Sequence, residues 1–319
     1  MPTADTVVLE IDGVKFTLAE FERRRPTALA KPFNTLYEGE RKALSKFVDE
    51  YLLEQQAAKE HLTVPELLDK HANKTIGPDP SEEALHAVYE AMDAKQPFES
   101  LRGKILDHIH DVRVEKARAA YTEALRSQAK VAILLSQPRA QVSLGDAAID
   151  GPANAPVMII EYADYECPYC QQAYPTLEKV LSEYKGKIAM AYKDTPLPMH
   201  AHAQKAAEAA HCAGQQGKYV EFHDLMYSTR QLEIANLKED ARKLKLDTDA
   251  FDKCLDSGAQ AEIVKAQLKE GAGLGIEGTP SFYVNGRFVS GSPTVEDWHK
   301  LIDAELAGSA KSTETAERH

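Results

Sequence analysis

Several features that would place the sequence in a familiar class are absent. Only four of the 319 residues are cysteines, and only one pair of them is close, whereas a structural zinc site made of cysteines usually shows two close pairs. No apolar run approaches the roughly 20 residues that a membrane-spanning helix needs. The net charge is −12, which argues against nucleic acid or anionic lipid as the main partner.

The start of the chain also lacks a targeting signal. Residues 1–5 contain neither the basic stretch nor the apolar run of a signal peptide, so we expect either a cytosolic protein or a form from which a signal has been removed. An even number of cysteines fits an oxidising compartment and favours the second option. The length of 319 residues predicts two domains, and a composition of 43% hydrophobic and 28% charged residues predicts ample core.

The most informative stretch is Cys167-Pro168-Tyr169-Cys170. It follows the apolar residues 157–162, which predict a buried strand, and it precedes a helical pattern. Pro168 suits the first position of a helix, which places Cys167 at the helix N-terminus. Unpaired N–H groups and the helix dipole stabilise a thiolate there, so we predict a redox pair. Half of a zinc site and an inert structural disulfide are the alternatives.

Residues from about 142 to 306 resemble the DsbA-like branch of the thioredoxin superfamily. The motifs that carry the resemblance occur in order: EYADYECPYC at 161–170, AHC at 210–212, KYVEFHDL at 218–225, FDKCLDSG at 251–258 and GTPSF at 278–282. The resemblance implies an α/β thioredoxin-like fold with a helical insertion at about 199–273. It also implies a cis proline, Pro280, that faces the cysteine pair.

The resemblance implies roles for individual residues. Cys167 would be the exposed nucleophile and Cys170 the buried resolving thiol. Glu161 would shuttle a proton to the resolving cysteine, although it could instead be a strand residue whose side chain reaches solvent. Thr279 and Pro280 would form the edge against which substrate backbone pairs. Substrate binding would also involve Pro168 and Tyr169.

The two remaining cysteines, Cys212 and Cys254, fall within the predicted helical insertion. The resemblance implies that they form a second, structural disulfide, and the alternative is two buried free thiols. His200, His202 and His211 are not at convincing spacing for a metal site. The glycine-rich stretch 271–275 follows a helix rather than a strand, so it does not predict a dinucleotide site. We therefore expect no cofactor and no metal.

The N-terminal part, about 6–137, resembles the chaperone domain of the SurA and PrsA group. The motifs are a strand ending in IDG at 11–13, TLAEF at 17–21, LLEQQAAK at 52–59 with LTV at 62–64, and KVAILL at 130–135. Capping boxes at 17–20 and 63–66 predict helix starts, and the longest helix is predicted at 98–134. The resemblance implies that an apolar cleft binds unfolded polypeptide. The alternative is a helical scaffold that serves only for dimerisation.

Together these patterns predict a mainly helical chaperone or dimerisation domain at 1–137. A linker with the strand that leads into the fold would occupy 138–155, the DsbA-like domain 156–306, and a disordered tail 307–319. We expect a thiol–disulfide oxidoreductase that acts on unfolded or misfolded exported proteins. A DsbG- or ScsC-type isomerase or reductase, or a holdase chaperone with secondary redox activity, is the alternative. Expected partners are client polypeptides, a membrane redox partner that recycles the pair, and possibly a second copy through the N-terminal domain. The protein would be periplasmic or otherwise exported.

Overall fold

The computed structural model describes residues 3–25, 27–92 and 94–316, with side chains described as far as residue 308. The chain forms two compact units. The sheet unit contains Met1–Leu36 and Gln137–His319, and the helical unit contains Tyr37–Ser136. The predicted boundary near 137 coincides with one change between units. The first 36 residues, however, belong to the sheet unit, because Ala30 packs with Ile160 and Leu274 and Lys31 pairs with Glu277.

The first elements of the sheet unit are a hairpin and a short helix. Strands β1 (Val7–Ile11) and β2 (Val14–Thr17) are antiparallel. Asp12-Gly13 is typical of a tight hairpin turn, and both residues have positive φ, 50° and 82°. Helix α1 (Leu18–Arg24) begins with the predicted capping box, in which Thr17 and Glu20 exchange side-chain and backbone hydrogen bonds.

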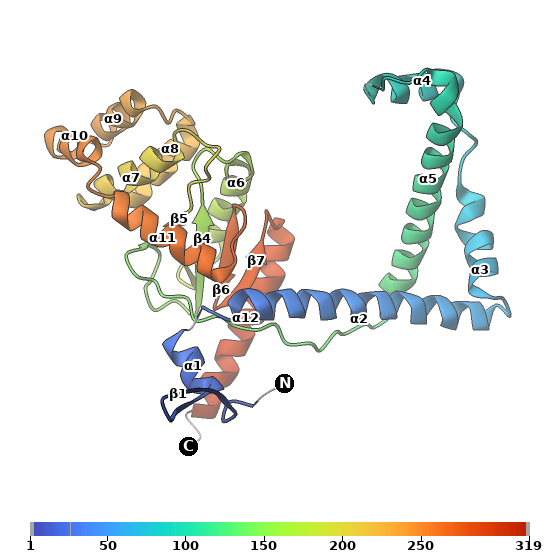
Figure 1. Cartoon of the computed structure of the whole chain (residues 1–319), viewed down its shortest axis with the longest axis horizontal. Coiled ribbons are helices and arrows are strands. Elements are labelled where there is room, and N and C mark those ends of the chain that lie inside the picture. Colours follow the sequence, from blue (N-terminus) through green and yellow to red (C-terminus); the bar gives the residue numbers. More distant parts are fainter. Residues whose placement is uncertain (1–2, 26, 93, 317–319) are drawn as a thin grey trace. The chain divides into compact units, whose positions relative to one another are not determined.

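The helical unit is built from α2, α3, α4 and α5, which Figure 1 shows in blue to green. Their bounds are Ala30–Lys59, of which the residues after Leu36 belong to this unit, Val64–His71, Glu82–Ala91 and Phe98–Gln128, with a 3₁₀ turn at Asn73–Thr75. A small core of Ala57, Leu67, Ala72, Leu85 and Ile105 is buried among them. Polar contacts add to it: the His71 ring stacks on Tyr121, and Arg126 on α5 binds Asp49 on α2.

One helix prediction in this unit needs correction. The long helix was expected to reach 134, but α5 ends at Gln128, because Ala129 adopts an extended backbone with ψ of 146°. The following residues lead to Arg139, which forms an isolated bridge with Arg287 of the sheet unit. An apolar periodicity alone does not show where such a connecting segment leaves the helix.

A five-stranded sheet forms the centre of the sheet unit, with the order β3-β5-β4-β6-β7. The strands are β3 (Ala148–Asp150), β4 (Val157–Ala163), β5 (Ile188–Asp194), β6 (Ser281–Val284) and β7 (Arg287–Ser290). β4 is parallel to β5 and antiparallel to β6. The predicted order of strand, helix and helical insertion is confirmed.

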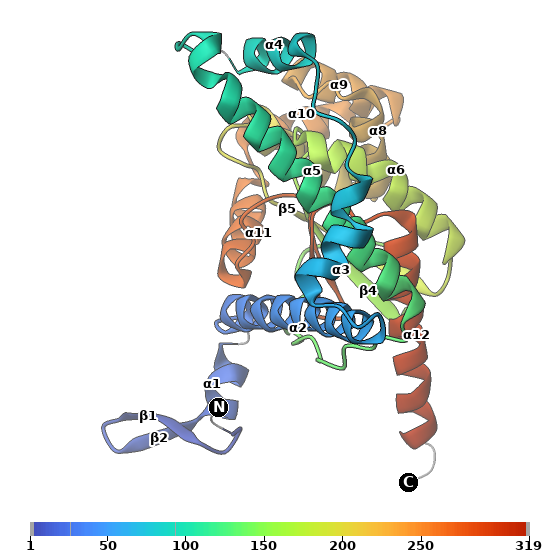
Figure 2. The same cartoon turned by 90° about the vertical axis from the view of Figure 1, so that its right-hand side faces the viewer.

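Helices cover both faces of this sheet, which explains why β4 is apolar apart from Glu161. Figure 2 shows α11 (Ala261–Leu274) on one side of the strands and α6 (Pro168–Glu183) with α12 (Val295–Ala316) on the other. Alternate residues of β4 point to opposite faces. Ile159 and Ala163 join the cluster of α6, and Ile160 and Tyr162 join the cluster of α11. The same alternation points Glu161 toward α6.

The helical insertion and the C-terminal helix complete the unit. The insertion contains α7 (Ala203–Gly214), α8 (Tyr219–Thr229), α9 (Ile234–Lys243), α10 (Thr248–Ser257) and α11. The predicted disordered tail needs correction, since α12 continues to Ala316. The polar composition of residues 307–316 is compatible with a helix as well as with a disordered segment. Residues 317–319 lie outside the described part of the chain. Within the described ranges, none of the helices combines the length and the apolar character that crossing a bilayer requires.

Candidate functional site

The cysteine pair lies where β4 gives way to α6. Asp164 shapes the connecting turn: its Oδ1 accepts the Glu166 N–H at 2.8 Å, and its carbonyl accepts the Cys167 N–H at 3.1 Å. Cys167 is the N-cap residue of α6, and Pro168 occupies the first turn. The local sequence therefore places Cys167 where free N–H groups and the helix dipole favour a negative charge.

The environment of Cys167 lowers the pKa of its thiol to about 5. The largest cause is the hydrogen bond from the Cys170 thiol, and contributions from Thr279 and from the Tyr169 and Cys170 backbone add to it, while burial opposes them. The Sγ atom lies 3.4 Å from the Thr279 carbonyl oxygen. Cys167 is only 3% exposed, so the expected exposed nucleophile is wrong in this respect. The loop that carries Thr279 covers it.

Cys170 has the opposite electrostatics. It is 1% exposed, and burial raises the pKa of its thiol far above the ordinary value, with further increases from Cys167 and from Glu161. Both cysteines carry free thiols in the structure. The pair is thus asymmetric: Cys167 ionises readily, whereas Cys170 keeps its proton.

Glu161 lies behind the pair on β4. It is 3% exposed, so the alternative in which its side chain reaches solvent is wrong. Burial, together with the charges of Asp194 and Glu178, raises the pKa of its carboxyl group to about 8. Glu161 lines a small cavity of about 10 Å³, which Tyr165 and His223 also line. A space of that size is close to the minimum that one water molecule needs.

The loop before β6 faces the cysteines. The peptide bond between Thr279 and Pro280 is cis, and both residues line an open groove of about 650 Å³. Tyr169 lines the same groove and is 64% exposed. Pro168 is exposed at the start of α6 but is not among the groove residues. The groove thus brings together three of the four residues that the sequence assigns to substrate binding.

Cys212 on α7 and Cys254 on α10 form a disulfide, with their Cα atoms 5.9 Å apart. In the structure they are therefore not the two buried free thiols of the alternative reading. The three histidines of this region do not share a site. His200 contacts Asp164, and His211 contacts Asp194. Among the described residues, no group of three or more His, Cys, Asp or Glu side chains is arranged to hold a metal ion.

Sequence patterns missed the buried polar network beside Glu161. The Asp194 carboxylate accepts hydrogen bonds from His211 at 2.9 Å and from the Tyr219 hydroxyl at 3.3 Å. Tyr165 contacts His223 at 3.1 Å. These residues are far apart in the sequence. The one sequence feature that could have indicated them is the presence of polar side chains within otherwise apolar helices.

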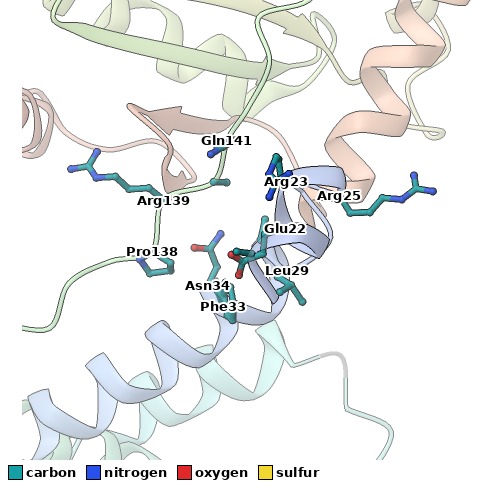
Figure 3. A pocket seen from close by; sticks show the side chains of 12 residues that line it. Glu22, Arg23, Arg25, Leu29, Phe33, Asn34, Pro138, Arg139 and Gln141 are labelled. Atoms are coloured by element: carbon teal, nitrogen blue, oxygen red, sulfur yellow. The ribbon is translucent and has the colours of Figure 1, made fainter. Parts of the chain in front are cut away.

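Another hollow, of about 370 Å³, lies between α1, the start of α2 and residues 138–141 (Figure 3). Glu22, Arg23, Asn34 and Arg139 are among its lining residues. The Arg139 guanidinium is already paired with Glu305 at 2.8 Å. None of the lining residues surrounds the cysteine pair, so this hollow is not part of the candidate site.

Comparison with solved structures shows the fold of the sheet unit. BdbD from Bacillus subtilis, in its oxidised form, is 19% identical and has a TM-score of 0.50, covering 54% of this chain and 100% of that one. A thioredoxin-like oxidoreductase from Silicibacter pomeroyi is 26% identical over 51% of this chain and 94% of its own, with a TM-score of 0.46. Wolbachia pipientis α-DsbA1 is 22% identical over 54% of this chain and 96% of its own, with a TM-score of 0.49.

Among curated proteins, the chain is similar to part of a Na⁺/H⁺ antiporter, NhaA 1, of Salinispora arenicola. The identity is 39% over 163 residues, which is 50% of this chain and 25% of the antiporter. NhaA 3 of Salinispora tropica is 38% identical over 150 residues, 46% of this chain and 23% of that protein. The chain thus spans about a quarter of the length of these relatives. The family model described as thioredoxin matches residues 144–304, half of the chain, and with the cysteine pair and the fold on which it lies, this shows that the chain belongs to the thioredoxin family.

Proposed function

We propose that the chain is a thiol–disulfide oxidoreductase of the DsbA-like type, with Cys167 and Cys170 as the reactive pair. The observation that carries the proposal is the asymmetry of the two thiols. The pKa of Cys167 is lowered to about 5, whereas that of Cys170 is raised by burial. Disulfide exchange needs one thiolate that attacks and a second thiol that waits in its protonated form.

The exchange follows from this arrangement. The Cys167 thiolate attacks one sulfur of a substrate disulfide, which forms a mixed disulfide and releases the other substrate sulfur as a thiolate. Cys170 then loses its proton and attacks the Cys167 sulfur, which frees the second substrate thiolate. The substrate disulfide is reduced by two electrons and the Cys167–Cys170 pair is oxidised to a disulfide. The reverse sequence donates a disulfide to a substrate dithiol.

Glu161 is the proposed proton acceptor for Cys170. It is buried on the face of β4 toward α6, and its charge acts on the Cys170 thiol. A carboxyl group with a pKa of about 8 can both take up and return a proton near neutral pH. Cys170 is not among the residues that line the cavity of about 10 Å³ beside Glu161, so the proposed proton transfer does not run through that cavity.

We propose unfolded or misfolded exported polypeptides as substrates. The groove of about 650 Å³ beside Thr279 and Pro280 supports this, since an extended peptide can pair there as an added strand. The Cys212–Cys254 disulfide supports an oxidising compartment such as the periplasm, where disulfides persist. A membrane redox partner would then restore the pair after each turnover.

The test uses two variants of the full chain with a disulfide-bonded protein substrate. Cys167→Ser should abolish exchange, and Cys170→Ser should accumulate a mixed disulfide between Cys167 and the substrate. If Cys170→Ser turns over at the wild-type rate, the pair does not act as proposed. A glutathione titration of the wild type then gives the redox potential. A value near −120 mV favours a disulfide donor and a value near −270 mV favours a reductase.

A second function for the helical unit is favoured by its exposed apolar side chains. On α2, Leu44, Phe47 and Tyr51 are 40%, 62% and 50% exposed, and the Phe47 and Tyr51 rings stack. We propose that this surface, Leu44, Phe47 and Tyr51, binds unfolded polypeptide, in keeping with the SurA-like pattern of the sequence. Use of the same surface for dimerisation is the alternative. Ile105 on the longest helix, α5, is 4% exposed and belongs to the core, so it adds nothing to this surface.

A further inference from the structure

The loop between β5 and α7 is tied to the turn that leads into Cys167. The Leu197 N–H donates to Asp164 Oδ2 at 2.7 Å, and the His202 N–H donates to Glu166 Oε2 at 2.7 Å. Both acceptors belong to the three residues directly before the reactive cysteine. The loop is therefore held against the cysteine turn by hydrogen bonds to charged acceptors, which are stronger than bonds between neutral groups.

This attachment fixes one titratable side chain of the loop. The His200 Nδ1 atom lies 2.7 Å from Asp164 Oδ2. The Asp164 side chain is fully buried, and that of His200 is 18% exposed. Because a carboxylate only accepts, the imidazole donates its Nδ1 proton. The Asp164 carboxylate thus orients the ring, and its negative charge favours the protonated form.

The groups that face His200 all favour its positive charge. The hydrogen bond to Asp164 is the largest cause that raises the pKa of His200, burial opposes it, and the charges of Asp164, Cys167 and Glu166 raise it further. The described residues include no hydrogen bond between His200 and the Cys167 sulfur. The two side chains therefore interact through their charges.

We propose that His200, held by Asp164, is a positioning residue whose positive charge stabilises the Cys167 thiolate and makes the oxidised pair a stronger oxidant. The effect on the oxidising strength of the pair rests on the proposed function, whereas the charge interaction between His200 and Cys167 does not depend on the substrate. A group that stabilises the thiolate stabilises the reduced pair, and the oxidised pair then accepts electrons more readily. The effect should vanish as the pH rises through the raised pKa of His200, because the imidazole then loses its charge.

The experiment compares His200→Gln with His202→Gln in the full chain. His202 is a matched control, since it lies in the same loop but acts on Glu233 instead. In His200→Gln, the ultraviolet titration of the Cys167 thiolate should move to higher pH. The equilibrium constant with glutathione should shift by about threefold or more toward the oxidised protein. His202→Gln should change neither quantity, and His200→Lys should restore both and keep them at alkaline pH.

A measurement on the wild type tests the proposal even if a variant fails to fold. Because the interaction is reciprocal, oxidation of the pair removes the thiolate and should move the NMR titration of His200 to lower pH. An unchanged His200 titration on oxidation, or equal effects of His200→Gln and His202→Gln, would overturn the proposal. If the thiolate titration shifts as expected but the wild type does not exchange with glutathione, the proposed function fails and the charge interaction stands.

Discussion

At the scale of single residues, the surroundings of the two cysteines decide their chemistry. Both thiols are almost fully covered, yet Cys167 meets N–H groups and the Cys170 thiol, whereas Cys170 meets apolar groups and the Glu161 carboxyl group. Burial is the largest cause that raises the pKa of Cys170, whereas at Cys167 the hydrogen bonds around the helix start outweigh burial.

This asymmetry predicts how the reduced protein reacts with iodoacetamide. Alkylation of Cys167 should increase with pH around a midpoint of about 5, following its lowered pKa. Cys170 should remain unlabelled at pH 6 as long as the protein is folded, since its pKa is raised and its side chain is covered. Peptide mass spectrometry after timed labelling measures both rates. Faster labelling of Cys170 would reverse the assigned roles.

Glu161 predicts a pH dependence of stability. The native state keeps its proton up to about pH 8, whereas a free carboxyl group loses it near 4.5. The native state therefore binds more protons between these values, and the free energy of unfolding decreases as the pH rises. We expect Glu161→Gln to be more stable than the wild type by on the order of 3 kcal/mol at pH 8, with no gain below pH 4.

Urea unfolding of the reduced proteins at both pH values measures this difference. Glu262→Gln is the control, because the Glu262 side chain is 85% exposed. A difference between wild type and Glu161→Gln that does not change with pH would mean that Glu161 ionises normally in the folded protein.

At the scale of elements, the helical insertion contains its own covalent cross-link. The disulfide joins α7 to α10 across a sequence separation of 42 residues, and it is distant in the chain from the reactive pair. Unlike Cys167, neither of its cysteines lies at a helix N-terminus, where a thiolate leaving group would be stabilised. This gives the bond a structural role within the insertion and leaves the redox chemistry to α6.

We therefore expect mild dithiothreitol to leave the Cys212–Cys254 disulfide closed while it reduces an oxidised Cys167–Cys170 pair. The double variant Cys212→Ala, Cys254→Ala should lose about 4 kcal/mol of unfolding free energy, because the unfolded chain is no longer constrained. Its glutathione equilibrium should equal that of the wild type. Urea unfolding and mass spectrometry of alkylated peptides measure these effects. A changed redox potential would show that the disulfide acts on the reactive pair.

At the scale of the whole molecule, the chain combines a redox unit with a helical unit that has a small core. Phe47→Glu with Tyr51→Glu should weaken suppression of aggregation of an unfolded protein by about tenfold, since charges replace the apolar contact surface. Reaction with glutathione should not change. Lys46→Glu, at a side chain that is 78% exposed, introduces a similar charge beside that surface and is the control.

Light scattering of a client and sedimentation of the variant distinguish the two roles of this surface. Loss of aggregation suppression without a change in mass supports client binding. A change from dimer to monomer with full suppression supports dimerisation. If neither property changes, the exposed apolar side chains of α2 have no part in either role.

Local patterns in the sequence sufficed to predict many of the turns, helix starts and strands of this protein. The turn at Asp12-Gly13, the capping boxes at Thr17 and Thr63, and the order of elements around Cys167 follow from neighbouring residues, because turns, caps and strand periodicity depend on contacts over a few positions. The helix start at Cys167 likewise follows from Pro168 directly after it.

Contacts between residues far apart in the sequence determined the features that local patterns did not predict. The burial of Cys167 depends on Thr279, more than a hundred residues away, and the orientation of His200 depends on Asp164. The assignment of residues 1–36 to the sheet unit and the end of α5 at Gln128 also depend on packing partners elsewhere in the chain. Burial and charge interactions are sums over neighbours in space. For that reason the sequence alone determined which cysteines could react, and only the tertiary structure decided how their pKa values differ.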